Sequence, residues 1–475
     1  MPVDLMRDPA PIPQFDLEQP ITKLLHLIWT SRPDLQAAFD ISKPDGQAAF
    51  RSWAGEGVKR EYGVDARSLP TDKLERTDGH AEADRPGLLE KLKGFFQRAE
   101  APTPALGAPG ATLIGYTHGV LGMGEHVRMS AEALSSTRVP FGVLDIDTGA
   151  GDRPDESTSS YPRVNTNRYR ANIFHVNADQ MLPTYCRLGA SFFADRYNIG
   201  FWAWELAEWP HSWRPILEMV DEIWAPSRFI QDCLKAATDK PVVHMPLCVE
   251  LPAFERLPRS RFNLPEDACL FLFAFDFNSY IERKNPFAAI RAFKDAFTDG
   301  AEAAGLVVKV MKADETSDRW REMMQLIDAD PRIHVINEVM TRGEVLALMD
   351  ACDCFVSLHR SEGFGRGPAE AMYLGKPVIV TSYSGNMDFT RTGASLLVDY
   401  KLIPVGEGEY VHGAGQVWAD ADVSQAAEQM RRVYSGDADV PEIAARGQAI
   451  IRKEFSNAAV GRNMERRLTE LGALE

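Results

Sequence analysis

Short apolar segments that alternate with helical segments, in two successive series, constrain this chain more than any other feature. The first series has predicted strands at residues 111–116, 141–146, 172–176, 197–203 and 222–225. The second has them at residues 269–275, 306–310, 333–336, 354–357, 377–381 and 396–398. Strands that alternate with helices form parallel sheets covered by helices on both faces. The sequence therefore predicts an α/β protein with two tandem doubly wound domains, which bind ligands at the carboxyl ends of their strands.

The expected domain boundaries follow from the segments around these series. Residues 1–110 form a helical or irregular N-terminal extension that ends in a linker, and residues 111–252 form the first domain. Residues 253–455 form the second domain, and residues 456–475 form a C-terminal helix. The stretch 252–265, rich in Pro and Arg, is the predicted hinge. A chain of 475 residues is too long for one ordinary core, in agreement with this division.

Two helices are predicted within the extension. Residues 21–29 have the spacing of an amphipathic helix, and residues 88–98 mix Lys with Leu and Phe. A helix of the second kind can make a peripheral contact with a membrane surface. The favoured interpretation is that it packs on the body of the protein or on a second subunit of a homo-oligomer.

Composition excludes several classes of protein. Hydrophobic residues make up 45% of the chain and charged residues 25%, as in soluble globular proteins. The net charge of −16 argues against nucleic acid as a partner. No apolar run is long enough to cross a bilayer, the first residues lack the layout of a signal peptide, and six cysteines form no disulfide framework. These features predict a cytoplasmic protein, either free or bound peripherally at the inner face of the membrane.

The segment 361–370, with the sequence SEGFGRGPAE, places Glu362 and Glu370 around a glycine-rich turn. The turn follows a predicted buried strand and leads into a helix, whose free N–H groups and dipole favour phosphate. Carboxylates do not bind phosphate, so their predicted partners are neutral hydroxyls. An anion site flanked by two hydroxyl-binding acids suggests a sugar nucleotide. The alternative is a helix N-terminus that carries acidic residues without a binding role.

This Glu-x7-Glu arrangement resembles the signature of glycosyltransferase family 4, whose members are retaining enzymes with the GT-B fold of two Rossmann-like domains. The resemblance covers residues 111–470. It implies that Glu362 contacts the hydroxyls of the donor sugar and that Glu370 holds the ribose of the nucleotide. It also implies that backbone around Gly363, Phe364 and Gly365 lies against the sugar and the diphosphate. In GT-B proteins the last helix usually crosses back to the first domain, a role that residues 457–471 would take.

Arg283 and Lys284 follow the first strand of the second series and precede a predicted helix at 287–297. Cations must meet the negative charge that grows on a departing diphosphate. Family 4 enzymes place an Arg/Lys pair at this point, so the resemblance assigns both residues to the catalytic site. The preceding residues, 276–282, depart from the commonest spacing of the family. The alternative for the pair is ordinary solvated surface.

A glycine loop at residues 115–124 joins the first predicted strand to the next helix. Glycines such as Gly122 and Gly124 let the backbone approach a ligand closely. In family 4 the equivalent loop faces the donor phosphate and helps to shape the acceptor site. His118 and His126 flank the loop, and each is a candidate for contact with phosphate or acceptor.

Further candidates lie at the ends of predicted strands. His175 matches a family histidine close to the donor sugar, although a single histidine there is more often structural. Glu205 follows an aromatic strand and is an acceptor-side candidate. Asn386 lies in a loop that borders the donor sugar in relatives, with turn formation as its alternative role. Val339 and Met340 lie where family members pack the nucleotide base.

The resemblance predicts a retaining glycosyltransferase that moves a hexosyl unit from a nucleotide diphosphate sugar to a hydroxyl of a glycan or lipid-linked acceptor. Bacterial polysaccharide biosynthesis is the expected setting, by analogy with relatives. No Asp-x-Asp motif in a suitable loop and no clustered His/Cys set occur, so no metal and no cofactor beyond the co-substrate are expected. The alternatives are a GT-B sugar-nucleotide epimerase and a catalytically silent sugar-nucleotide-binding or scaffold protein.

Overall fold

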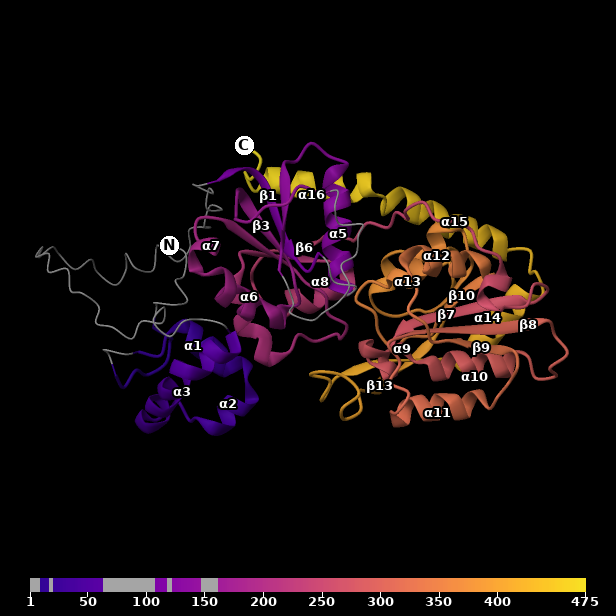
Figure 1. Ribbon diagram of the computed structural model, residues 1–475, viewed down its shortest axis with the longest axis horizontal. Coiled ribbons are helices and arrows are strands. Elements are labelled where there is room, and N and C mark those ends of the chain that lie inside the picture. The colour runs from indigo at the N-terminus through magenta and orange to yellow at the C-terminus, as the bar shows by residue number, and fades with distance from the viewer. Residues whose placement is uncertain (1–8, 17–19, 63–106, 118–121, 147–160) are drawn as a thin grey trace, which may run out of the picture.

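A computed structural model describes residues 9–16, 20–62, 107–117, 122–146 and 161–475 of the chain. Two α/β domains lie side by side, with the helices of the N-terminal extension against the first of them (Figure 1). The predicted helix at 88–98 lies outside the described residues. Within the described ranges, no helix combines the length and the apolar character that a membrane span requires.

The first domain is built on a six-stranded parallel sheet with the strand order β2-β1-β3-β4-β5-β6. The strands are β1 (Ala108–Gly115), β2 (Phe141–Asp145), β3 (Tyr169–His175), β4 (Tyr197–Phe201), β5 (Glu222–Ala225) and β6 (Val242–His244). Every residue of β4 and β5 is buried, as expected for strands covered on both faces. The sequence pattern did not predict β6, because a strand of three residues carries too little periodicity.

Helices and 3-10 turns connect these strands. The helices are α5 (Gly122–Ser135), α6 (Met181–Leu188), α7 (Ala190–Phe193) and α8 (Arg228–Lys235), and the longest 3-10 segment is η4 (His211–Met219). The prediction placed the start of α5 at residue 125, whereas the helix begins at Gly122. Gly122 and Gly124 therefore belong to the first turn of α5.

The second domain repeats this plan with the strand order β12-β11-β10-β7-β8-β9, again with parallel neighbours. Its strands are β7 (Cys269–Asp276), β8 (Ala304–Met311), β9 (Ile333–Ile336), β10 (Cys354–Ser357), β11 (Val378–Thr381) and β12 (Leu396–Val398). Its helices are α9 (Ile281–Lys284), α10 (Pro286–Ala296), α11 (Asp318–Ile327), α12 (Arg342–Ala351), α13 (Arg366–Tyr373) and α14 (Val423–Tyr434). Two parallel sheets of this kind confirm the predicted fold class.

An antiparallel hairpin, β13 (Tyr400–Pro404) and β14 (Val417–Ala421), leaves the second domain and reaches the first. The ring of Tyr410 lies 5.8 Å from that of Trp204, and the ring of His412 lies 4.9 Å from that of Trp213. The backbone N–H of Glu208 donates to the Gln416 side chain at 3.1 Å. The sequence pattern did not reveal this hairpin, because no residue of β13 is buried.

The N-terminal extension contributes helices α1 (Lys23–Ser31), α2 (Pro33–Ala38) and α3 (Pro44–Tyr62). Thr22 caps α1 by accepting from the backbone N–H of Leu25. The apolar face of α1 carries Leu24 and Ile28, which share one hydrophobic cluster with Ile216 of η4. The extension therefore completes the core of the first domain.

The chain ends with α15 (Val440–Glu454) and α16 (Asn457–Glu470), and α16 packs along the first domain against α5 (Figure 1). The helices come close at Gly461, where a Cβ atom would lie 2.2 Å from the carbonyl oxygen of Ala133. Only glycine allows this approach. Ser136 also donates to the carbonyl of Asn457 at 3.1 Å.

Candidate active site

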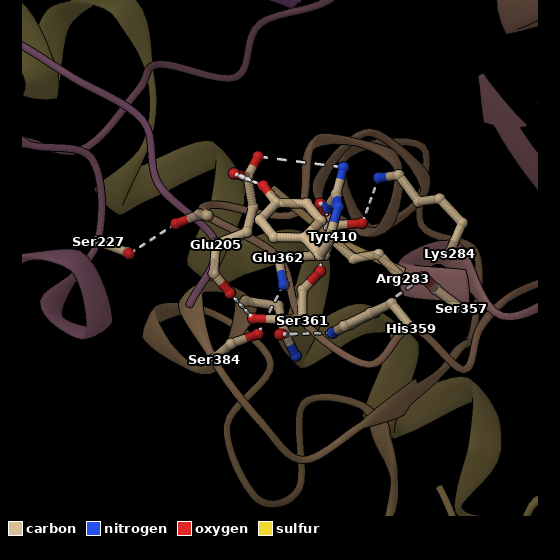
Figure 2. Close-up of polar contacts among 12 residues, drawn as sticks. Glu205, Ser227, Arg283, Lys284, Ser357, His359, Ser361, Glu362, Ser384 and Tyr410 are labelled. Carbon is tan, nitrogen blue, oxygen red and sulfur yellow. Dashed lines mark hydrogen bonds and ion pairs between the residues drawn. The ribbon is translucent and has the colours of Figure 1, made fainter. Parts of the chain in front are cut away.

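Side chains from both domains converge at the carboxyl ends of β7 and β10 (Figure 2). Arg283 and Lys284 end α9, the single-turn helix after β7. The carbonyl of Arg283 accepts from the backbone N–H of Arg360 at 2.8 Å. The Asn285 side chain donates to the carbonyl of Leu358 at 3.0 Å. Both cations are therefore held against the segment that follows β10.

Glu362 pairs with these two cations. Lys284 Nζ donates to Oε1 of Glu362, and Arg283 Nη1 lies 3.4 Å from Oε2. Burial opposes ionisation of Glu362, but the charges of Lys284 and Arg283 outweigh it and lower its pKa to about 2. Glu362 is therefore a carboxylate at neutral pH.

Glu205 approaches the same cluster from the first domain. Its Oε2 accepts from the hydroxyl of Tyr410 at 2.6 Å, and its Oε1 lies 4.0 Å from Arg283 Nη2. The guanidinium carbon of Arg283 lies 5.9 Å from the centre of the Tyr410 ring. Ser361 donates from its hydroxyl to the backbone carbonyl of Glu205. Residues that are distant in sequence thus form one polar cluster across the two domains.

The glycine turn after Glu362 is tightly packed. The backbone N–H of Gly385 donates to the Glu362 carbonyl at 2.9 Å, and a Cβ atom on Gly385 would lie 2.0 Å from the carbonyl oxygen of Gly363. The Ser227 hydroxyl of the first domain donates to that same oxygen at 2.6 Å. Gly365, with φ 92°, precedes α13 in a conformation that favours glycine. These contacts fix the backbone that leads into α13.

The three central residues of the turn, Gly363, Phe364 and Gly365, are buried. Phe364 is 6% exposed, and its ring packs against those of Phe389 and Phe455. Gly363 and Gly365 are buried as well, so these three positions offer a ligand no side chain.

His359 was not singled out from the sequence, yet it is fully buried beside this turn. Its Nδ1 lies 3.0 Å from the Ser357 hydroxyl and its Nε2 lies 3.0 Å from Oδ1 of Asn386. The Asn386 amide donates to the carbonyl of Thr381 and to the hydroxyl of Thr390, each at 3.0 Å. Both donors of Asn386 are engaged within the protein, so the residue supports the turn. The signal that could have identified His359 is a polar residue two positions after the end of a buried strand.

Glu370 lies on α13 with 3% of its surface exposed. Arg342 binds it through two contacts, Nη2 to Oε1 at 2.7 Å and Nη1 to Oε2 at 2.9 Å, and Arg366 Nε lies 3.2 Å from Oε1. Arg366 also lies 3.7 Å from Glu125 of α5. Burial raises the pKa of Glu125, but Arg366 and Arg128 outweigh it and lower the pKa to about 2. Sequence reasoning missed Arg342, whose partner is 28 residues away.

His175 and His126 form a buried pair, with their Nδ1 atoms 2.9 Å apart. Burial lowers the pKa of His126 to about 3 and holds that of His175 well below its ordinary value. Both imidazoles are therefore neutral at pH 7. The Nε2 atom of each ring is buried without a hydrogen-bond partner in the structure.

The other predicted site residues range from buried to largely exposed, and one lies outside the described part of the chain. Val339 is 85% exposed and Met340 is partly buried, both after β9. Gly124 is buried and Gly122 is exposed in the first turn of α5. His118 lies outside the described residues. In the described part of the chain, no group of three or more His, Cys, Asp or Glu side chains is placed to hold a metal ion.

Residues 260–401 match the family model described as glycosyl transferases group 1. A comparison with curated proteins finds no match. Among solved structures, sucrose-phosphate synthase from Thermosynechococcus elongatus is similar, with a TM-score of 0.57 and 16% identity over 77% of this chain and 100% of that one. Anabaena HepE in complex with UDP and glucose is similar with a TM-score of 0.55 and 14% identity, over 76% of this chain and 100% of that one. A glycosyltransferase from Rickettsia africae has a TM-score of 0.53 and 11% identity, over 76% of this chain and 98% of that one. The chain therefore has the fold of GT-B glycosyltransferases, and residues 260–401 of its second domain are similar to glycosyl transferases group 1.

Proposed function

We propose that this protein is a retaining glycosyltransferase that transfers a hexosyl unit from a nucleotide diphosphate sugar to a hydroxyl of a glycan or lipid-linked acceptor. The observation that carries the proposal is the convergence of Arg283, Lys284 and Glu362 at the carboxyl ends of β7 and β10, opposite Glu205 of the first domain. The match to the glycosyl transferases group 1 model includes the first three of these residues.

The cations suit a departing diphosphate. Backbone and Asn285 contacts hold α9 against the segment that follows β10, so Arg283 and Lys284 lie close to the position where charge would develop. A diphosphate would compete with Glu362 for both cations. Its oxygen would then accept the proton of the attacking hydroxyl in a front-face displacement, with Glu362 positioning the sugar and not attacking it.

The proposed donor site continues along α13. Backbone of Gly363, Phe364 and Gly365 lies at the start of this helix, where free N–H groups favour phosphate. Glu370 is the proposed ribose ligand, and a ribose hydroxyl would share its carboxylate with Arg342. Val339 and Met340 are proposed to border the base, and His175 and Asn386 to lie near the sugar.

We also propose that the reaction is independent of a metal, because side-chain cations and helix N-termini occupy the position where a metal would otherwise neutralise the leaving group. The surroundings of Glu362 support this, since Lys284 and Arg283 would repel a divalent ion from its carboxylate.

A thermal-shift screen against UDP-, GDP-, ADP- and dTDP-sugars tests the proposal. We expect sugars of one base to raise the unfolding temperature, because a ligand at 100 times its Kd adds about 2.7 kcal/mol of stability. Incubation of that donor alone and with glycan or lipid-linked acceptors then separates the alternatives. Conversion of the donor to its epimer without an acceptor would indicate an epimerase. Binding without release of nucleoside diphosphate under any condition would indicate a silent binding protein.

A further inference from the structure

We propose that Tyr280, Glu205 and Tyr410 form a subsite for a neutral pyranose ring of the acceptor, an inference that rests on the proposed glycosyl transfer. It assigns sugar recognition to a residue, Tyr280, that neither the sequence nor the family resemblance singled out. It also favours a saccharide over a phosphate or a lipid chain as the group held next to the reacting hydroxyl.

Tyr280 presents an aromatic ring at the edge of the active site. The residue directly precedes α9, which carries Arg283 and Lys284, and it is 39% exposed. Its backbone has φ 63° and ψ 103°, a conformation that a tyrosine adopts only at a cost of about 1–3 kcal/mol. Its ring lies 4.7 Å from the ring of Tyr410. The surrounding structure thus holds an exposed aromatic ring beside the two cations in spite of backbone strain.

Glu205 supplies a fixed carboxylate beside these rings. Tyr410 donates to its Oε2 at 2.6 Å, while its Oε1 lies 4.0 Å from Arg283, beyond hydrogen-bond distance. The Glu205 side chain is 24% exposed, so a ligand hydroxyl can reach it. A carboxylate oxygen accepts well from a neutral hydroxyl.

The hairpin that carries Tyr410 makes the subsite rigid. Contacts of Tyr410 with Trp204, of His412 with Trp213 and of Gln416 with Glu208 join the hairpin to the first domain. Glu205 lies within this same segment of the first domain. The carboxylate and the two rings are therefore fixed relative to each other by packing.

The Tyr280 ring and the Glu205 carboxylate together suit a sugar ring better than a phosphate or a lipid chain. An aromatic face packs against the apolar face of a pyranose ring, and a carboxylate accepts from its hydroxyls. Glu205 adds a negative charge on the Tyr280 side of the cluster, and this charge disfavours a phosphate there but not a neutral hydroxyl. Glu205 is the acceptor-side candidate, and the glycine turn is proposed for the donor, so we assign the pyranose at Glu205 and Tyr280 to the acceptor.

Saturation-transfer NMR with the full-length protein tests this subsite. The probes are the methyl glycosides of glucose, galactose, mannose and N-acetylglucosamine, and glycerol serves as the open-chain control. Each is titrated in the presence of the nucleoside diphosphate that stabilises the protein most. We expect at least one methyl glycoside to bind, with its ring protons saturated, and glycerol to show no comparable binding.

Substitutions then locate the bound sugar. Tyr280→Ala keeps the Cβ atom and thus the same backbone constraint, and it should raise the Kd of the methyl glycoside about tenfold, the equivalent of about 1.4 kcal/mol. Tyr280→Phe should keep the Kd within about twofold. Tyr434→Ala is the matched control, since Tyr434 is also 39% exposed but lies on α14. Glu205→Gln should also weaken binding, because the amide loses the charge that the sugar hydroxyls contact.

The outcomes separate this inference from the proposed function. Thermal shifts with the nucleoside diphosphate should be equal in the native protein and in the Tyr280 variants, which also shows that the variants are folded. Nucleotide binding without binding of any methyl glycoside would overturn the subsite and leave the proposed function standing. An unchanged Kd in Tyr280→Ala, or an equal loss in Tyr280→Phe, would also overturn it. Absence of nucleotide binding in the native protein would refute the proposed function itself.

Discussion

Replacing Arg467 with alanine should destabilise the first domain, because Arg467 of α16 neutralises a buried carboxylate on β5. Glu222 is 0% exposed and accepts from Arg467 through Nε at 3.0 Å and through Nη2. Its other donors are neutral, the indole N–H of Trp224 at 2.7 Å and the hydroxyl of Tyr197 at 3.3 Å. Arg467→Ala would leave the carboxylate with these two donors and no positive charge.

The expected magnitude follows from these contacts. Breaking a buried ion pair by removing one partner costs about 3–5 kcal/mol. Since Trp224 and Tyr197 still donate to Glu222, we expect the lower end, about 3 kcal/mol. A domain of about 150–250 residues loses about 2–4 °C per kcal/mol. The midpoint of the first domain should therefore fall by about 6–12 °C.

Differential scanning calorimetry measures this shift, and two variants act as controls. Arg466→Ala changes an exposed arginine on the same helix and should move the midpoint by at most about 2 °C. Adding Glu222→Gln to Arg467→Ala removes the unpaired charge and should recover part of the loss. The reasoning is refuted if Arg467→Ala is no less stable than Arg466→Ala.

Four further outcomes are expected. Arg283→Ala should reduce turnover about 10²–10³-fold, as measured by steady-state release of nucleoside diphosphate; an unchanged rate would contradict the proposed role. Glu370→Ala should weaken nucleoside diphosphate binding about tenfold in calorimetric titration, and equal affinity would exclude it as the ribose ligand. In Gly385→Ala the new Cβ atom would lie 2.0 Å from the Gly363 carbonyl oxygen, so activity should be lost while far-UV circular dichroism stays native; native activity would contradict this packing. Burial lowers the pKa of His126 to about 3 in the folded protein, against 6.5 in the unfolded chain. Below pH 6.5 the unfolded chain gains a proton that the folded protein does not, so the free energy of unfolding should fall by about 1.4 kcal/mol per pH unit. Urea unfolding at pH 7.5, 6.5 and 5.5 checks this, and the slope should be smaller in His126→Phe.

Local pattern was sufficient to predict most of the fold. Buried parallel strands such as 269–275 and 306–310 stand out as short apolar runs, because both of their faces are covered. β6 and the β13–β14 hairpin were not predicted, because neither forms a recognisable apolar run. The first is too short to show a period, and the second has mostly exposed residues.

The candidate site was predicted where its members follow strand ends and missed where they act through distant contacts. Arg283 and Lys284 lie in the connection after β7, and Glu362 lies in the connection after β10, so a topological rule places them together. Tyr410 reaches Glu205 across 205 residues of sequence from a hairpin that carries no motif. Such pairings depend on tertiary structure and leave no periodic signal in the chain.

The phosphate ligands can be identified most directly in a crystal structure of the protein with the nucleoside diphosphate selected by the thermal-shift screen. The proposed function predicts the β-phosphate within hydrogen-bond distance of Arg283 and Lys284, with the ribose at Glu370. A diphosphate bound elsewhere, with the Lys284–Glu362 pair undisturbed, would contradict it.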